Sequence, residues 1–238
     1  MRLVHLGCAG LRVELPEGRV LAIDPPRDPG PGIAIAVGWN EAERLQGARE
    51  AVVSGRRPMV YASAPVLAWL GACDPFEGWA IEAEPYEPIP YAAPAEALRK
   101  AGSAVRGPLR AARRLTRRAR LPSAEPLALR LRLPDGRALV HLSCALHKGT
   151  PAAWLERVAA AWAGADWLVA GWDFGHGAAF RERIRAFAPR WLILADFTGD
   201  VRRGLGMPCE ALGPCADALA AAGQPTLTLA SGTALRFA

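Results

Sequence analysis

With 238 residues, of which 51% are hydrophobic and 22% charged, the chain is long enough to bury a sizeable core, and its composition excludes a disordered protein. No apolar run reaches the roughly 18 residues that a membrane span needs, and the N-terminus lacks a signal-peptide pattern. We therefore predict a single cytoplasmic domain over residues 1–238. The five cysteines form no CxxC pair and are odd in number, so we expect buried free thiols rather than a disulfide framework.

The first part of the chain predicts antiparallel strands followed by alternating strands and helices. Alternation predicts that one face of the opening strands consists of Leu3, His5, Leu11, Val13 and Leu15. The sequence Pro-Glu-Gly-Arg at 16–19 predicts a hairpin turn. The following predicted elements are strands at 20–23, 33–37 and 59–62, helices at 41–54 (with Asn40 as a candidate N-cap) and 64–70, and an extended segment at 79–90.

A basic segment at 99–120 contains nine of the lysines and arginines and no acidic residue; without it the net charge of +6 would be −3. Residues 108–120 predict a helix whose arginines share one face, namely Arg110, Arg113, Arg114, Arg117 and Arg118. This face fits three interpretations: a solvated surface, a surface that contacts nucleic-acid phosphates, or a helix that docks on an acidic protein or an anionic membrane. No aromatic residue lies between Tyr91 and Trp154, which argues against single-strand recognition by stacking.

The second part of the chain repeats the pattern of the first. It predicts a strand at 127–133, a turn at 134–137 and a strand at 138–142, then a helix at 151–163 with Thr150 as its N-cap. Strands at 167–170 and 191–195, helices at 178–188 and 215–222, and a strand pair within 226–237 follow. The repeat is architectural rather than one of sequence. It predicts an α/β (α+β) fold, a four-layer αββα sandwich of two mixed β-sheets flanked by helices.

Several short motifs, in their order and spacing, resemble the metallo-β-lactamase superfamily over nearly the whole chain. The N-terminal motifs are Leu-Gly-Cys-Ala-Gly at 6–10 and Leu-Ala-Ile-Asp-Pro at 21–25. Similar strand ends and loops occur at 140–144, 165–177 and 189–196. The branch that the chain resembles most is that of the ascorbate-phosphate-lactonase-like hydrolases. The resemblance implies the αββα fold and, in typical members, one or two Zn, Mn or Fe ions that generate a hydroxide nucleophile.

The residues that correspond to the family's metal ligands have been replaced in this chain. In register with the family motif THxHxDH, the histidine positions fall on Gly38, Asn40 and Glu43, and the aspartate position on Ala42. Only Glu43 is a plausible donor. Cys8 stands at the signature histidine after Gly7, Cys144 at the bridging aspartate and Asp196 at the final histidine. The middle histidine would fall near the basic segment and has no counterpart there. We therefore expect no metal cofactor, with zinc in a Cys/His/Asp set as the alternative.

The resemblance leaves three hypotheses for function. The first is a non-catalytic binding or partner subunit, as a homo- or hetero-oligomer, with an unknown protein or small molecule as its partner. The second is a divergent hydrolase of lactone, phosphodiester or thioester bonds, in which Cys144 is the nucleophile, His147 or His176 the base and Asp196 its orienting group. The third is nucleic-acid binding by the arginine face. The predicted pocket contains Cys8, Asp24, Trp39, Asn40, Glu43 and Asp173. Each of these residues also has an interpretation without a function: Cys144 as a buried thiol, His141 as a packed or capped side chain, His147 as a solvated loop residue and His176 as part of a plain turn.

Overall fold

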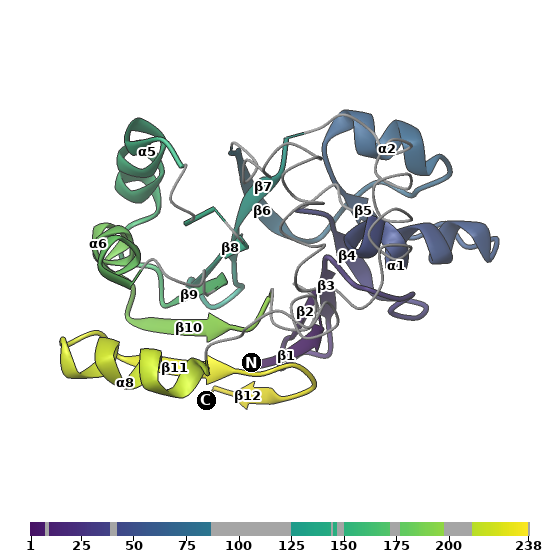
Figure 1. Ribbon diagram of the computed structural model, residues 1–238. Coiled ribbons are helices and arrows are strands. Elements are labelled where there is room, and N and C mark those ends of the chain that lie inside the picture. The colour runs from purple at the N-terminus through teal and green to yellow at the C-terminus, as the bar shows by residue number, and fades with distance from the viewer. Residues whose placement is uncertain are drawn as a thin grey trace, which may run out of the picture.

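Two six-stranded mixed sheets form the centre of the computed structural model (Figure 1). It describes residues 1–7, 10–38, 42–86, 125–143, 145–146, 150–171, 177–197 and 211–237, with the backbone alone at 42–44 and 177–179. The first sheet contains β1 (Arg2–Gly7), β2 (Gly10–Glu14), β3 (Val20–Ile23), β4 (Ala34–Ala36), β5 (Val60–Tyr61) and β12 (Ala234–Arg236). The second contains β6 (Ala80–Pro85), β7 (Leu127–Arg132), β8 (Ala138–Ser143), β9 (Trp167–Gly171), β10 (Trp191–Ala195) and β11 (Thr226–Leu229). The strand orders are β12-β1-β2-β3-β4-β5 and β11-β10-β9-β8-β7-β6.

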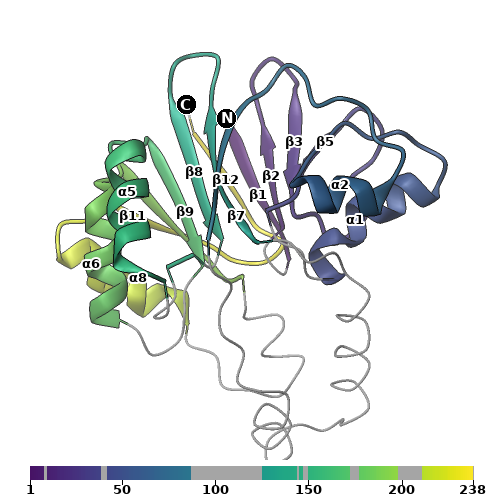
Figure 2. The ribbon, with the colours of Figure 1, turned by 90° about the horizontal axis from the view of Figure 1, so that it is seen from above.

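Five helices in the described part of the chain lie outside the two sheets (Figures 1 and 2). They are α1 (Ala42–Val53), α2 (Ala64–Leu70), α5 (Ala152–Trp162), α6 (Gly177–Phe187) and α8 (Leu212–Ala221). Side chains of α1 and α2 pack against β4 and β5, whereas α5, α6 and α8 pack against the second sheet. Each helix was predicted from the sequence at this place, although α8 begins three residues before the predicted start at 215. None of the described helices is long and apolar enough to cross a membrane.

The main apolar core lies between the two sheets. It combines inward side chains of the first sheet, such as Leu3 and Val13, with those of the second, such as Leu139 and Ile193. The face predicted from alternation is confirmed, because all five of its members are buried. Trp154, Trp162 and Trp167 are buried as well. The two sheets therefore share one core, and removing either sheet would expose the apolar face of the other.

The two halves of the chain follow the same plan. In the first half, β1, β2 and β3 are antiparallel neighbours, and β4 pairs with β3 in parallel. In the second half, β6, β7 and β8 are antiparallel neighbours, and β9 pairs with β8 in parallel. The β2–β3 turn has the sequence Leu-Pro-Glu-Gly-Arg at 15–19, and the β7–β8 turn Leu-Pro-Asp-Gly-Arg at 133–137. Both turns place a glycine in the left-handed region, Gly18 at φ 87° and Gly136 at φ 85°. The repeat is thus one of sequence as well as of architecture at these turns, contrary to our expectation.

Three further expectations are corrected. Pro151 occupies the N-cap position of α5, and Thr150 instead donates its hydroxyl hydrogen to the carbonyl of Ala145. The two cysteines in the described ranges, Cys73 and Cys215, are half-buried rather than buried. The last two strands do not pair: β11 joins the second sheet beside β10, and β12 joins the first beside β1. The predicted helix at 108–120 lies outside the described residues.

Candidate functional site

The carboxyl ends of the parallel strands of both sheets meet at one edge of the molecule. In Figure 2 this edge lies at the lower side of the sheets, whereas the two chain ends lie at the opposite edge. Asp24 and Gly38 follow the strands of the first sheet, and Ser143, Gly171 and Phe197 stand at or just after the ends of β8, β9 and β10. In sheets with parallel strands, the carboxyl edge is where ligands usually bind. We therefore consider the carboxyl edge the candidate site.

Asp24 joins the end of β3 to the segment that follows β4. Its side chain is fully buried, and its backbone has a left-handed φ of 45°, a conformation that aspartate tolerates better than most residues. Its N–H donates to the carbonyl of Ala36 (2.9 Å), and its Oδ1 accepts a hydrogen bond from the N–H of Gly38 (2.8 Å). A hydrogen bond between a buried carboxylate and a backbone N–H is among the stronger ones in proteins. Asp24 therefore fixes the position of Gly38.

Gly38 in turn joins the two sheets. Its carbonyl oxygen accepts a hydrogen bond from the N–H of Leu127, at the start of β7, with an N–O distance of 2.5 Å. A Cβ atom at position 38 would lie 2.9 Å from the Leu127 carbonyl oxygen and 3.3 Å from Asp24 Oδ2. The first distance is shorter than the contacts that Cβ atoms make in real proteins, and the Leu127 oxygen is a backbone atom that no side-chain rotation can move away. A side chain at position 38 would therefore require β7 to move.

Aromatic rings fill the space between the sheets below this edge. Phe197 stacks on His5 of β1, with a ring-centroid distance of 5.6 Å, and packs on His141 of β8 at 5.3 Å. All three side chains are fully buried, so the prediction of a packed His141 is confirmed. Gly171 lets Phe197 approach closely, since a Cβ there would lie 2.8 Å from its ring. The sequence indicated that His5 faces the core, but no local pattern indicated its partner across the sheets.

The structure brings two of the predicted site residues, Asp24 and Asp196, to this edge. Asp196 is half-buried and lies between the end of β10 and Phe197. Glu43 belongs to α1, but its side chain is outside the described residues. The other predicted site residues also lie outside them: Cys8, Trp39, Asn40, Cys144, His147, Asp173, His176, Arg110, Arg113, Arg114, Arg117 and Arg118. Among the residues that the structure does describe, no three histidine, cysteine or acidic side chains gather as a metal site would require.

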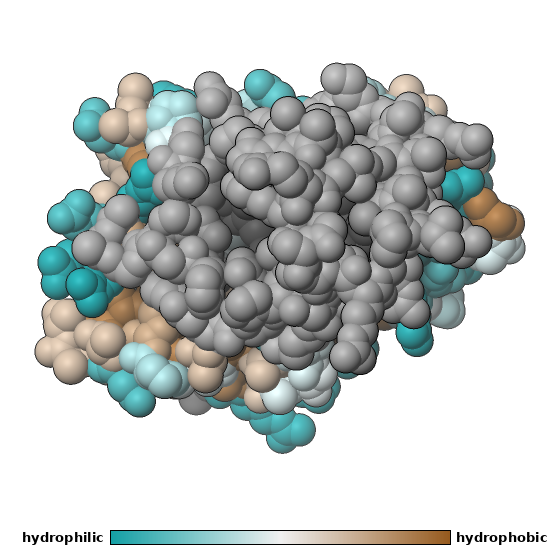
Figure 3. Space-filling view, in the orientation of Figure 1, coloured by the Kyte–Doolittle hydropathy of each residue, from teal (hydrophilic) through white to brown (hydrophobic). Residues whose placement is uncertain are grey.

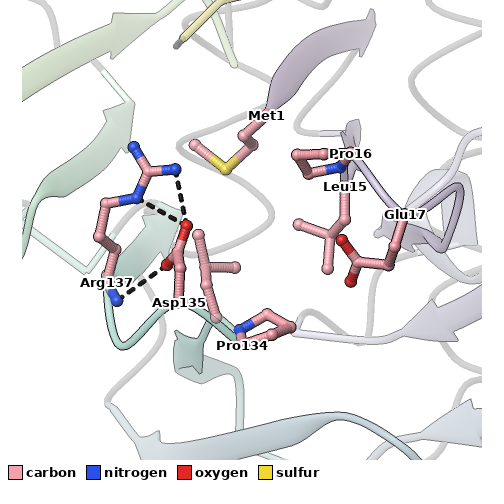
Figure 4. Close-up of a pocket in the computed structure, with 8 residues that line it drawn as sticks. Met1, Leu15, Pro16, Glu17, Pro134, Asp135 and Arg137 are labelled. Atoms are coloured by element: carbon pink, nitrogen blue, oxygen red, sulfur yellow. Dashed lines mark hydrogen bonds and ion pairs between the residues drawn. The ribbon is translucent and has the colours of Figure 1, made fainter.

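A cavity of about 150 Å³ lies at the opposite edge, between the two hairpin turns (Figure 4). Its lining consists of Met1, Leu15, Pro16, Glu17, Leu133, Pro134, Asp135 and Arg137. Hydrogen bonds from the side chain and backbone of Arg137 hold the pKa of Asp135 below its ordinary value. Sites for small molecules usually measure about 300–1,000 Å³, so this cavity fits a single side chain rather than a substrate. None of the predicted site residues lines it.

Side chains on the visible surface differ between the helices of the second sheet. Hydrophobic side chains gather over α8, and hydrophilic ones over α6 (Figure 3).

The two six-stranded mixed sheets and the five helices of the described ranges make this an α/β protein. No protein-family model matches the chain, and no curated protein matches it in sequence.

Proposed function

We propose that this chain is a non-catalytic member of the metallo-β-lactamase fold class, built as a four-layer αββα sandwich, and that it acts as a binding or partner subunit. Two mixed sheets with a shared core and helices outside agree with that architecture. The motif at 6–10 begins in the last residues of β1, and the motif at 21–25 includes the end of β3. Fold alone does not specify function, so the proposal depends on the carboxyl edge.

The observation that carries the proposal is the contact of Gly38 with Leu127. Position 38 is where the resemblance places the first histidine ligand. Glycine offers no donor atom, and the 2.9 Å approach to the β7 carbonyl leaves no room for a Cβ. The carboxylate of Asp24 is engaged by the N–H of Gly38. These residues do not fit the ion that the resemblance implies, because metal ligands must converge on an open point rather than on a strand.

Metal analysis of the purified chain tests the proposal. Protein should be prepared with added Zn, Mn and Fe, desalted, and measured by inductively coupled plasma mass spectrometry. We expect less than about 0.1 ion per chain, unchanged by Asp196→Ala. One ion per chain that is lost in Asp196→Ala would refute the proposal.

Activity assays separate this function from the hydrolase hypothesis. Its nucleophile and candidate bases, Cys144, His147 and His176, lie outside the described residues. Lactone, phosphodiester and thioester substrates should be assayed with the wild type and with Cys144→Ala. We expect no turnover by either protein; turnover that Cys144→Ala abolishes would establish a hydrolase instead.

A further inference from the structure

The outer face of β12, β1 and β2 has no cover from the described helices. Strand register places seven side chains on this open face: Arg2, Val4, Leu6, Arg12, Glu14, Ala234 and Arg236. The core clusters beneath the five described helices contain no side chain from these three strands. Val4 and Leu6 are only half-buried, and Ala234 and Arg236 are exposed. The open face thus presents aliphatic side chains bordered by charged ones.

Positive charge predominates on the open face. Glu14 accepts ion pairs from Arg2 (2.9 Å) and Arg12 (2.6 Å), whose side chains are 37% and 33% exposed. Burial raises the pKa of Glu14, but the hydrogen bond from Arg2 and the charges of both arginines hold it below its ordinary value. Arg236 stands directly opposite Arg2, and no acidic side chain of the described part pairs with it. The open face carries three arginines and one glutamate, so its net charge is +2.

The other half of the molecule shows how such a face is covered. Arg130 of β7 has the same place in its half as Arg12 of β2, three residues before the repeated turn. Arg130 donates to the carbonyl of Ala161 in α5 (3.1 Å), and its side chain is only 14% exposed. Helix α5 also supplies Arg157, which forms an ion pair with Glu84 of β6 (2.6 Å). One helix therefore covers part of this outer face and supplies polar partners for its charged side chains.

We propose that an acidic amphipathic helix of a partner protein docks on the open face of β12, β1 and β2, much as α5 docks beside β6 and β7, the strands that correspond to β1 and β2. The inference rests on the proposed function, because it names the surface by which a partner subunit would bind. Charge complementarity requires carboxylates opposite the arginines, and Val4 and Leu6 require aliphatic side chains between them. A nucleic acid is disfavoured because the open face contains no aromatic side chain for base stacking.

A binding experiment with defined probes tests this surface. The first probe is a fluorescein-labelled amphipathic peptide of about 20 residues, with leucines on one face and glutamates beside them. The second is the same peptide with lysines in place of the glutamates. The third is a single-stranded DNA oligonucleotide with the same net charge as the acidic peptide. Fluorescence anisotropy would measure affinity for the full-length chain. Hydrogen exchange would locate the contact. The test variant is the double substitution Arg2→Gln and Arg236→Gln, and the matched control is Arg185→Gln and Arg190→Gln, two exposed arginines near the end of α6.

The acidic peptide should bind the wild type, slow hydrogen exchange at residues 1–14 and 234–236, and bind the test variant about fivefold more weakly. The control should bind like the wild type, and raising the salt from about 0.05 to about 0.3 M should weaken binding. Equal weakening in both variants, no binding of the acidic peptide, or tighter binding of DNA through the same arginines would overturn the inference. A concentration-dependent dimer that the test variant abolishes would also overturn it, since the occupant would be a second copy. The metal analysis described above is independent of this binding experiment, so failure here leaves the proposed function standing.

Discussion

Replacing Gly38 with alanine should weaken the join between the two sheets. The backbone of Gly38 lies outside the left-handed region, so alanine adopts its conformation and gains about 0.4–1 kcal/mol through the unfolded state. Against this gain, the added Cβ would lie 2.9 Å from the Leu127 carbonyl oxygen, a backbone atom that no side-chain rotation can move away. Overpacking of this kind costs about 1–3 kcal/mol. Losing the hydrogen bond from Leu127 costs about 0.5–1.5 kcal/mol more, so we expect a net loss of about 2 kcal/mol.

Urea unfolding followed by circular dichroism measures this change. A loss of about 2 kcal/mol should lower the unfolding midpoint by roughly 1 M urea, with the slope unchanged. The matched control is Gly213→Ala in α8, where a Cβ meets no atom within 4 Å. That variant should be as stable as the wild type or more stable, because alanine favours a helix. The reasoning is refuted if Gly38→Ala unfolds at the same urea concentration as Gly213→Ala.

Three other predictions concern packing and pH. Gly47→Ala should cost more than about 2 kcal/mol, because a Cβ there collides with the carbonyls of Pro25 and Arg27; an unchanged melting temperature would contradict this. Phe197→Ala should cost about 3–5 kcal/mol in urea unfolding, since its fully buried ring packs between the sheets; a loss below about 1 kcal/mol would mean that the ring is dispensable. The pKa of Glu14 is lower in the folded protein than in the unfolded chain. Glu14 therefore stabilises the fold at pH values above its pKa in the unfolded chain, and this stabilisation is lost as the pH falls through its pKa in the folded protein. Stability should therefore fall less steeply in acid for Glu14→Gln than for the wild type, and identical pH profiles would contradict the role of Glu14.

Local patterns in the sequence were sufficient to predict most of the fold. Alternation from Leu3 to Leu15 identifies the buried face of the first strands because side chains point to opposite sides at each step. The glycines of the two repeated turns mark hairpins because each supplies a positive φ that other residues avoid. The helix predicted at 151–163 lies within one residue of the observed α5 at both ends. These elements depend on interactions between neighbours in the chain, which the sequence displays directly.

The candidate site could be predicted only in part, because it depends on contacts between distant segments. The join between Gly38 and Leu127 connects strands of different sheets, and no pattern within either strand signals it. The stacking of Phe197 between His5 and His141 likewise depends on how the sheets face each other. The separation of β11 and β12 into different sheets was missed for the same reason. A short turn between two strands usually forms a hairpin, but β12 here pairs with β1, at the other end of the chain.

On the function proposed above, the loss of a metal ligand and the contact of β7 with the first sheet are one structural change at position 38. A histidine there would need space for its Cβ, and that space is occupied by the backbone of β7. Glycine both removes the imidazole and permits the hydrogen bond that holds β7 against the first sheet. A site that had lost only its ligand would leave a cavity, and empty cavities destabilise a protein by an amount that grows with their volume. Holding β7 against Gly38 avoids that cost, so this contact is the arrangement expected of a chain that, as we propose, binds no ion. On the same proposal, the outer face of β12, β1 and β2 is the surface that would bind a partner.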